Sequence, residues 1–334
     1  MTSKTSSRGN WIVYTSALSR LKWFSILYGL LLGLGTPLML WMELARQKFF
    51  QETQFIDGAF QVYNVNVLFN PVISLMNILA PMVFGLIIFH YLQNERESTF
   101  FHSLPIRRAR LYLQNLLAGL TLLWIPILIN SLLIYGVYLN FDILNVTWQN
   151  YSTGNMVEEL IPVWQIVVRW LAVSVLMTGL FFVFTSFVGM FTGNTLLQGA
   201  LSLIGLFLPL GIYILVKVNL ARMLYGFSEN VSGGKIAWLS PIVSYLDQQG
   251  QGFTIYWTGY ISYLVFTILF VILSVLLYRL RRVEAAGDTL AADWIRWVFK
   301  YGVAICAALS GGIYLGSVMR DSMEALYFGS LTLH

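Results

Sequence analysis

The densest group of side chains able to do chemistry lies in residues 94–110, where acids come first, an aromatic pair follows and arginines end the stretch. It reads Asn94-Glu95-Arg96-Glu97-Ser98-Thr99-Phe100-Phe101-His102-Ser103-Leu104-Pro105-Ile106-Arg107-Arg108-Ala109-Arg110. Ser103 can cap a new helix, and Pro105 suits the first helical turn. The stretch therefore predicts a short amphipathic helix that offers charged contacts to a surface. An anchor that binds anionic lipid is the alternative interpretation.

The rest of the sequence lacks the motifs of enzymes. Gly233-Gly234-Lys235 lacks the upstream glycine of a phosphate-binding loop, and neither His-Glu-x-x-His nor Gly-x-Ser-x-Gly occurs. The histidines His90, His102 and His334 are scattered, and the single cysteine, Cys306, can form neither an intramolecular disulfide nor a Cys/His metal pattern. We therefore expect no catalytic residue, bound metal or cofactor in this chain.

Composition limits the class of protein that can carry this charged stretch. The chain has 334 residues, of which 57% are hydrophobic and only 10% are charged. A soluble domain is about 25% charged, so a water-soluble enzyme is excluded. Disorder is excluded too, because it requires low hydrophobicity and high net charge.

Long apolar runs predict the fold class, an all-α polytopic membrane protein with about seven transmembrane helices. Each run reaches the ~20 residues that a helix needs to cross a bilayer. The runs are 23–42, 72–92, 111–139, 163–190, 195–216, 255–278 and 298–318. The apolar residues after Glu324 either lie at the outer interface or begin an eighth span that is incomplete at the C-terminus.

Basic residues predict the orientation, since cytoplasmic loops of membrane proteins are rich in lysine and arginine. With the N-terminus in the cytoplasm, 13 of the 20 basic residues fall inside. They are Lys4, Arg8, Arg20, Lys22, Arg96, Arg107, Arg108, Arg110, Arg279, Arg281, Arg282, Arg296 and Lys300. The net charge of +5 thus reflects membrane orientation, and no nucleic-acid partner is expected.

The middle of every predicted span lacks aspartate, glutamate, lysine and arginine. Ion-coupled carriers usually keep such a group inside the membrane to bind the coupling ion. If the protein moves a solute, we expect the energy to come from another subunit.

The segment before the first span has an amphipathic pattern. Trp11, Tyr14, Leu18 and Leu21 share one helical stripe, whereas the serines and basic residues fall largely elsewhere. This pattern predicts that residues 11–22 form either a helix in the inner interface or an extension of the first span into the headgroups.

The charged stretch resembles the loop between spans two and three of type-2 ABC exporter permeases. The similar residues are Glu95-Arg96-Glu97, Phe101-His102-Ser103-Leu104-Pro105-Ile106-Arg107-Arg108, Leu111-Tyr112, Asn115 and Gly119. Weaker resemblances are Tyr278-Arg279 with Arg282, Glu284-Ala285-Ala286-Gly287 and Lys300-Tyr301, and Leu239-Ser240-Pro241. The half-size bacterial subgroup, whose ATPases are separate chains, is the most similar.

This resemblance implies a coupling helix that docks into a groove of a cytoplasmic ABC ATPase subunit. The residues expected at that contact are Glu95, Glu97, Phe101, Leu104, Pro105, Arg107, Arg108 and Arg110. It also implies ATP bound by the partner, a second permease subunit that is identical or a sister chain, contact with membrane lipids, and a bacterial plasma membrane. Substrate would pass between the two permeases, contacted by spans one, two and five.

The same resemblance implies three parts of the chain. They are a cytoplasmic segment with an interfacial helix (1–22), a six-span core (23–280, with coupling loop 94–110 and outside helical segment 217–254), and a linker with the seventh span and an apolar stub (281–334). Two alternatives stay open: an ATP-independent secondary carrier or channel, and a non-transporting membrane sensor or scaffold.

Overall fold

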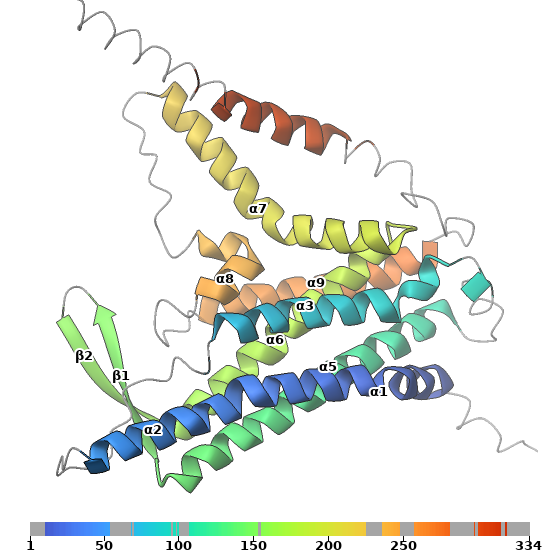
Figure 1. The fold of residues 1–334 in the computed structure, drawn as a ribbon. Helices are drawn as coiled ribbons and strands as arrows, with labels where there is room; N and C mark the ends of the chain where they lie inside the picture. The colour runs from blue at the N-terminus through green and yellow to red at the C-terminus, as the bar shows by residue number, and fades with distance from the viewer. Residues whose placement is uncertain are drawn as a thin grey trace, which may run out of the picture. The chain divides into compact units, whose positions relative to one another are not determined.

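The computed structural model describes most of the chain between residues 11 and 318 (Figure 1). The described residues are 11–53, 68, 70–94, 96–97, 99, 107–152, 155–224, 236–247, 257–280, 297, 300–314 and 318. Structural statements below concern these residues.

Helices dominate the described part of the chain, and six are long and apolar enough to cross a membrane. The elements are α1 (Ile12–Gly33), the π-helix η2 (Leu34–Leu38), α2 (Met39–Thr53), α3 (Pro71–Ile88), η4 (His90–Leu92), α5 (Arg108–Asn140), β1 (Asn145–Ser152), β2 (Asn155–Pro162), α6 (Val163–Gly189), α7 (Thr195–Met223), η5 (Ala237–Leu239), α8 (Pro241–Asp247) and α9 (Trp257–Leu280). These features agree with the predicted helical, multi-pass membrane protein.

Six of the seven predicted runs correspond to these long helices. The first is longer than expected, because α1, η2 and α2 follow one another without a break from Ile12 to Thr53. Residues 300–314 are helical and fall within the seventh predicted run. The apolar stretch after Glu324 lies outside the described residues.

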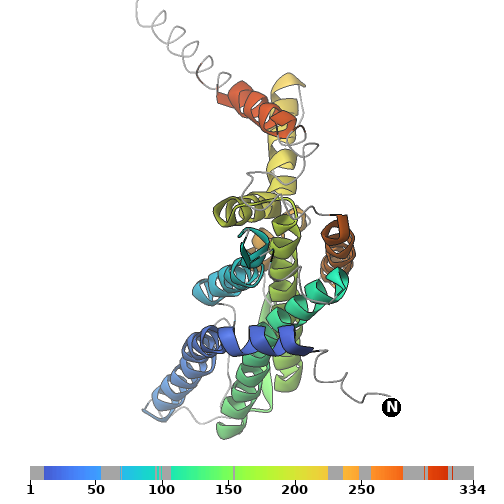
Figure 2. The ribbon, with the colours of Figure 1, turned by 90° about the vertical axis from the view of Figure 1, so that its right-hand side faces the viewer.

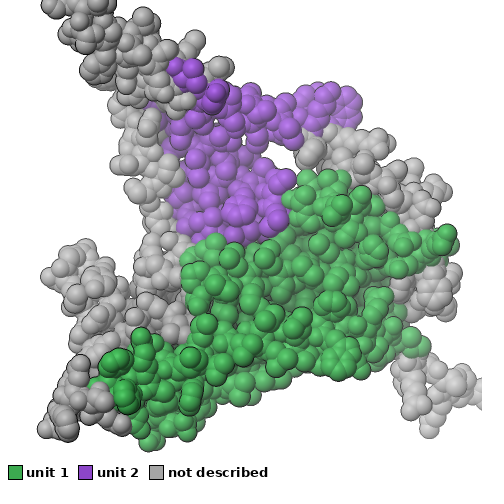
Figure 3. All heavy atoms as spheres, viewed as in Figure 1, with its two compact units in different colours: residues 1–202, 244–291 green, residues 203–243, 292–334 purple. Residues whose placement is uncertain are grey.

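Contacts divide the chain into two compact units, coloured separately in Figure 3. Unit 1 comprises residues 1–202 and 244–291, and unit 2 comprises 203–243 and 292–334. Within unit 2, the Asn219 amide of α7 donates to the carbonyl of Leu309 at 3.2 Å, which joins α7 to the helical residues 300–314.

Helix directions in unit 1 follow from its contacts. Ser25 of α1 pairs with Leu122 of α5, and Gly29 pairs with Asn130 further along both helices, so α1 and α5 run in the same direction. The ends of α3, α6 and α9 meet the start of α5, so these three helices run the opposite way. Residues Tyr91, Tyr112, Ser186 and Tyr278 mark that meeting point.

We call this end of unit 1 the basic end. Arg107, Arg108 and Arg110 open α5 there, and Arg279 lies in the last turn of α9. Two of the basic segments predicted to share one side of the membrane therefore lie together in the fold.

The first turns of α1 run in a different direction from the rest of the helix, as the dark-blue segment in Figures 1 and 2 shows. Hydrogen bonding continues through the change of direction, so residues 11–22 form no separate helix. The buried face of these turns is Val13, Ala17 and Leu21, whereas Trp11 is exposed.

A β-hairpin joins α5 to α6, which the sequence analysis did not predict. Strands β1 and β2 pair antiparallel, with Asn145 opposite Pro162 and Ser152 opposite Asn155. The sequence did carry a signal for this hairpin. It contains the β-forming residues Val146, Thr147 and Trp148 and a glycine-containing turn sequence after Ser152.

Two prolines shape the contact between α1 and α5. Pro126 has no N–H, so it leaves the carbonyl of Leu122 without its helical donor. The hydroxyl of Ser25 supplies that donor from α1 at 2.6 Å. Gly29 allows the close approach, because a Cβ there would lie 3.2 Å from Cβ of Pro126.

Pro37 creates the same problem inside the first span. A regular α-helix would leave the carbonyl of Gly33 without a donor. The chain instead adopts π-helical geometry over Leu34–Leu38. In a π-helix each carbonyl accepts from the N–H five residues later rather than four, so the donor for Gly33 is no longer the proline. The first span therefore widens here without ending.

Two glycines of α5 provide a matched test of core packing. A Cβ on Gly119 would lie 2.1 Å from the buried Phe182 ring, whereas a Cβ on Gly136 would meet nothing within 4 Å. We expect Gly119→Ala to destabilise the protein by about 1–3 kcal/mol through overpacking. Gly136→Ala should be neutral or stabilising, because alanine favours the helix. Thermal unfolding in detergent measures both, and equal transition temperatures would contradict the packing account.

Candidate functional site

The structure describes part of the charged stretch predicted to make contacts. Arg107 precedes α5 in extended conformation, Arg108 and Arg110 lie in its first turn, and all three are exposed. Glu97 is helical and partly buried. Glu95, Phe101, Leu104 and Pro105 lie outside the described residues, so the predicted capped helix stays a prediction.

The start of α5 is strongly electropositive. The N-terminus of a helix carries a partial positive charge from its unpaired N–H groups, which favours acidic side chains nearby. The first turn of α5 contains no acid and instead carries Arg108 and Arg110, with Arg107 immediately before it. This arrangement costs intrinsic helix stability and suits contact with an anionic surface, whether protein or lipid.

A chain of hydrogen bonds lies beside this segment at the basic end. The hydroxyl of Thr195 donates to Oε1 of Gln93 at 2.5 Å, so it accepts from Nδ1 of His90 at 3.0 Å. The amide of Gln93 donates to Oε1 of Gln198. Gln198 in turn donates to the carbonyl of Thr185 at 2.8 Å. We call these five residues the amide chain.

The amide chain connects three helices through side chains that are largely buried. It joins the segment after α3 to the start of α7 and to α6, with Gln93 8% exposed and Gln198 fully buried. Gly189 makes room for it, because a Cβ there would lie 2.6 Å from Nε2 of Gln198. Asn194 fixes the start of α7 by accepting from the N–H of Leu196 at 2.9 Å. A satisfied buried polar network of this kind makes its surroundings rigid.

Aromatic side chains complete the same junction. The ring of Tyr112 packs against Phe89 and Tyr278, and its hydroxyl lies 3.0 Å from that of Ser186. The hydroxyl of Tyr91 donates to that of Tyr278. Tyr112 and Tyr278, which belong to the family resemblance, thus have a packing role.

A second buried polar group lies elsewhere in unit 1. Tyr28 of α1 donates to Oδ1 of Asn77 at 2.7 Å, and the Asn77 amide donates to the hydroxyl of Tyr245 in α8 at 2.8 Å. Burial raises the pKa of Tyr245, although hydrogen bonds with Asn77 and Ser174 act in the opposite direction. These bonds hold three separate helices together.

Sequence reasoning missed both polar groups, because it searched the spans for ionisable residues. Gln93, Gln198 and Asn77 are uncharged, and single amides in apolar runs were the signal that could have found them. Among the described residues, no cluster of histidine, cysteine, aspartate and glutamate could hold a metal ion.

Comparison with known proteins assigns no family to this chain. No protein-family model matches the chain, and no curated protein matches it. The resemblance to type-2 exporter permeases therefore stays a prediction.

The amide chain should behave as one unit in a double-mutant cycle. Gln198→Leu leaves Gln93 and the carbonyl of Thr185 without their partners, which should cost about 1–3 kcal/mol. Adding Gln93→Leu removes one of those stranded groups, so the double variant should lose less than the sum of the two single losses. Thermal unfolding of the four proteins in detergent measures the coupling. Strictly additive losses would show that the two amides act independently.

Proposed function

We propose that the protein is the transmembrane permease subunit of an ATP-binding cassette exporter-like complex, whose separate cytoplasmic ATPase subunits hydrolyse ATP. The observation that carries this proposal is the charged stretch 94–110 between two membrane-crossing helices, in a chain whose sequence contains no catalytic motif. The stretch begins directly after Gln93 of the amide chain and ends in the arginine-rich start of α5.

The distribution of charge supports an external source of energy. The predicted spans lack aspartate, glutamate, lysine and arginine at their middles, so they offer no evident site for a coupling ion. A permease driven by a partner ATPase needs no such site, because nucleotide binding and hydrolysis change its conformation from the cytoplasmic side.

The basic end supports the orientation of the proposal. Arginines at the start of α5 and the end of α9 share this end, and the positive-inside rule assigns it to the cytoplasm. An ATPase would then approach the exposed Arg107 and Arg108 directly. A bacterial plasma membrane is the proposed location, and a second permease, identical or sister, completes the pathway.

The amide chain supplies a route for force. A displacement of the stretch after Gln93 would be felt at α7 through Thr195 and Gln198, and at α6 through Thr185. Rigid connections of this type let a small movement at one site bias the packing of several helices. The proposed sequence is therefore docking at 94–110, displacement of the end of α3, and rearrangement of α6 and α7.

Charge reversal tests the proposed docking surface. We expect the double variant Arg107→Glu, Arg108→Glu to weaken co-purification of the ATPase encoded beside this chain by about tenfold or more, since acidic contacts become repulsive. Leu104→Asp and Pro105→Gly should also weaken it. Lys48→Glu, an exposed cation of α2, serves as the matched control. Membrane insertion should be unchanged in every variant.

Three outcomes would contradict the proposal. The first is that no ATPase associates when the native gene neighbourhood is expressed. The second is transport in ATPase-free proteoliposomes driven by an ion gradient, which would indicate a secondary carrier or channel. The third is ATP-independent partner binding with no solute-stimulated ATPase activity, which would indicate a sensor or scaffold.

A further inference from the structure

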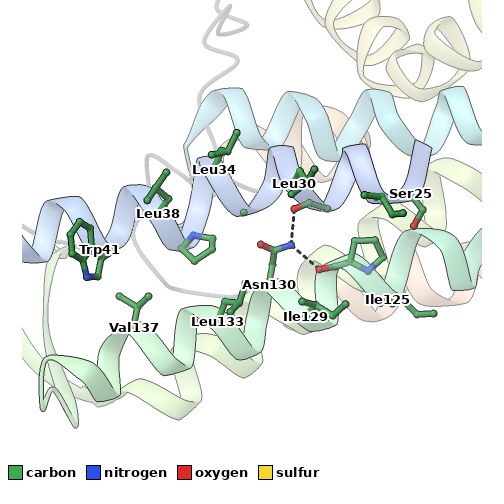
Figure 4. Close-up of a pocket in the computed structure, with 15 residues that line it drawn as sticks. Ser25, Leu30, Leu34, Leu38, Trp41, Ile125, Ile129, Asn130, Leu133 and Val137 are labelled. Atoms are coloured by element: carbon green, nitrogen blue, oxygen red, sulfur yellow. Dashed lines mark hydrogen bonds between the residues drawn. The ribbon is translucent and has the colours of Figure 1, made fainter. Parts of the chain in front are cut away.

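A long groove lies between the first span and α5 (Figure 4). Its volume is about 680 Å³, and it extends from Ser25 and Ile125 to Trp41 and Val137. Ile125 and Val137 are twelve residues apart, so the groove is roughly 18 Å long at the helical rise per residue. That length is close to the ~15 Å depth of one leaflet of a bilayer core.

The walls of the groove are apolar and accessible from outside. Leu30 and Leu34 line one side, and Ile129 and Leu133 line the other, each more than half exposed. The π-helical segment η2 forms part of the first wall, where Pro37 faces the groove. Such segments often mark functional positions in helices. In a membrane, these walls would contact hydrocarbon chains.

One polar side chain interrupts this apolar surface. The amide nitrogen of Asn130 donates to the carbonyl of Gly29 at 3.1 Å and to that of Pro126 at 2.9 Å. Two carbonyl acceptors fix the orientation of the amide, because its oxygen could not replace the nitrogen there. In Figure 4 the oxygen of Asn130 points along the groove, away from both hydrogen bonds.

That oxygen has no hydrogen-bond partner among the described residues. Asn130 is 2% exposed, and its Oδ1 is buried without a donor. Gly33 lies against it, since a Cβ there would sit 3.3 Å from Oδ1. Buried polar groups in native structures are rarely left unpaired, and each exception calls for an explanation, such as a water, an ion or another bound group that supplies the donor. In a hydrocarbon environment, lipid tails cannot supply the donor.

We infer that the groove binds a single-chain amphiphile from the membrane, and that a hydroxyl part-way along its chain donates to Oδ1 of Asn130. The apolar walls take the chain, and the hydroxyl approaches Oδ1 beside Gly33, which lines the groove without a side chain. This site is independent of the proposed coupling to an ATPase, because it uses none of residues 94–110.

The ends of the groove indicate how the amphiphile lies. Trp41 closes one end, and tryptophan favours the boundary between hydrocarbon and headgroups. Arg46 and Glu43, which pair at 2.8 Å, follow within about one turn and place charged groups beyond that end. Asn130 lies seven residues from Val137, or ~10 Å below that end. A hydroxyl near the middle of the chain therefore fits better than one at its terminus.

Native mass spectrometry of the full chain in detergent can measure this binding with a matched pair of probes. Mid-chain hydroxystearate carries the proposed donor, and stearate lacks it. We expect hydroxystearate to bind about fivefold more tightly, the change that one added hydrogen bond produces. Equal binding of the two fatty acids would overturn the proposal.

Two variants and a control locate the site. Asn130→Leu removes the acceptor, so it should abolish the preference for hydroxystearate. Leu133→Trp fills the groove and keeps Asn130, so it should reduce binding of both probes even if Asn130→Leu fails to fold. Leu264→Trp adds the same bulk at an exposed position of α9 and should change neither.

The variants also separate the amphiphile from another occupant. If wild-type protein forms a dimer that Leu133→Trp dissociates, and neither fatty acid competes with it, the groove is an interface between two copies and the proposal is wrong. Binding that survives Leu133→Trp unchanged would likewise overturn it, because the probes would then occupy another surface.

Discussion

A backbone carbonyl inside a hydrocarbon core must find its hydrogen-bond donor within the protein, since lipid offers none. Pro126 and Pro37 each remove such a donor from the middle of a span. At Pro126 the solution is tertiary, because Ser25 of the neighbouring helix donates to the carbonyl of Leu122. At Pro37 it is local, because the helix changes to π geometry.

These two solutions shape much of unit 1. The bond from Ser25 and the glycine at position 29 hold α1 close to α5, and Asn130 adds a second bridge one turn further along. The widening at η2 forms part of the groove wall beyond that bridge. The apolar groove and its unpaired Asn130 oxygen thus result from fitting two proline-containing helices against each other.

The basic end depends on exposed charge and buried hydrogen bonds rather than on prolines. Its exposed arginines suit an anionic surface, while the amide chain and tyrosines behind them make a rigid junction. A junction of buried amides is costly to leave half satisfied, so its members should move together. A junction whose members move together suits a site that receives force from a partner. The ring contact between Tyr112 and Tyr278 adds to the same rigid packing.

The amino-acid sequence by itself determined the class of protein and the positions of six spans, because twenty apolar residues in a row have few alternatives to a membrane helix. It also placed the charges, since charge is a property of residues rather than of contacts. Only the tertiary structure decided which neutral polar residues meet. Gln93 and Gln198 are far apart in the chain, as are Ser25 and Leu122, and their bonds exist because the helices pack side by side. Only the tertiary structure likewise decided the hairpin and the groove, because each depends on how one segment of the chain packs against another.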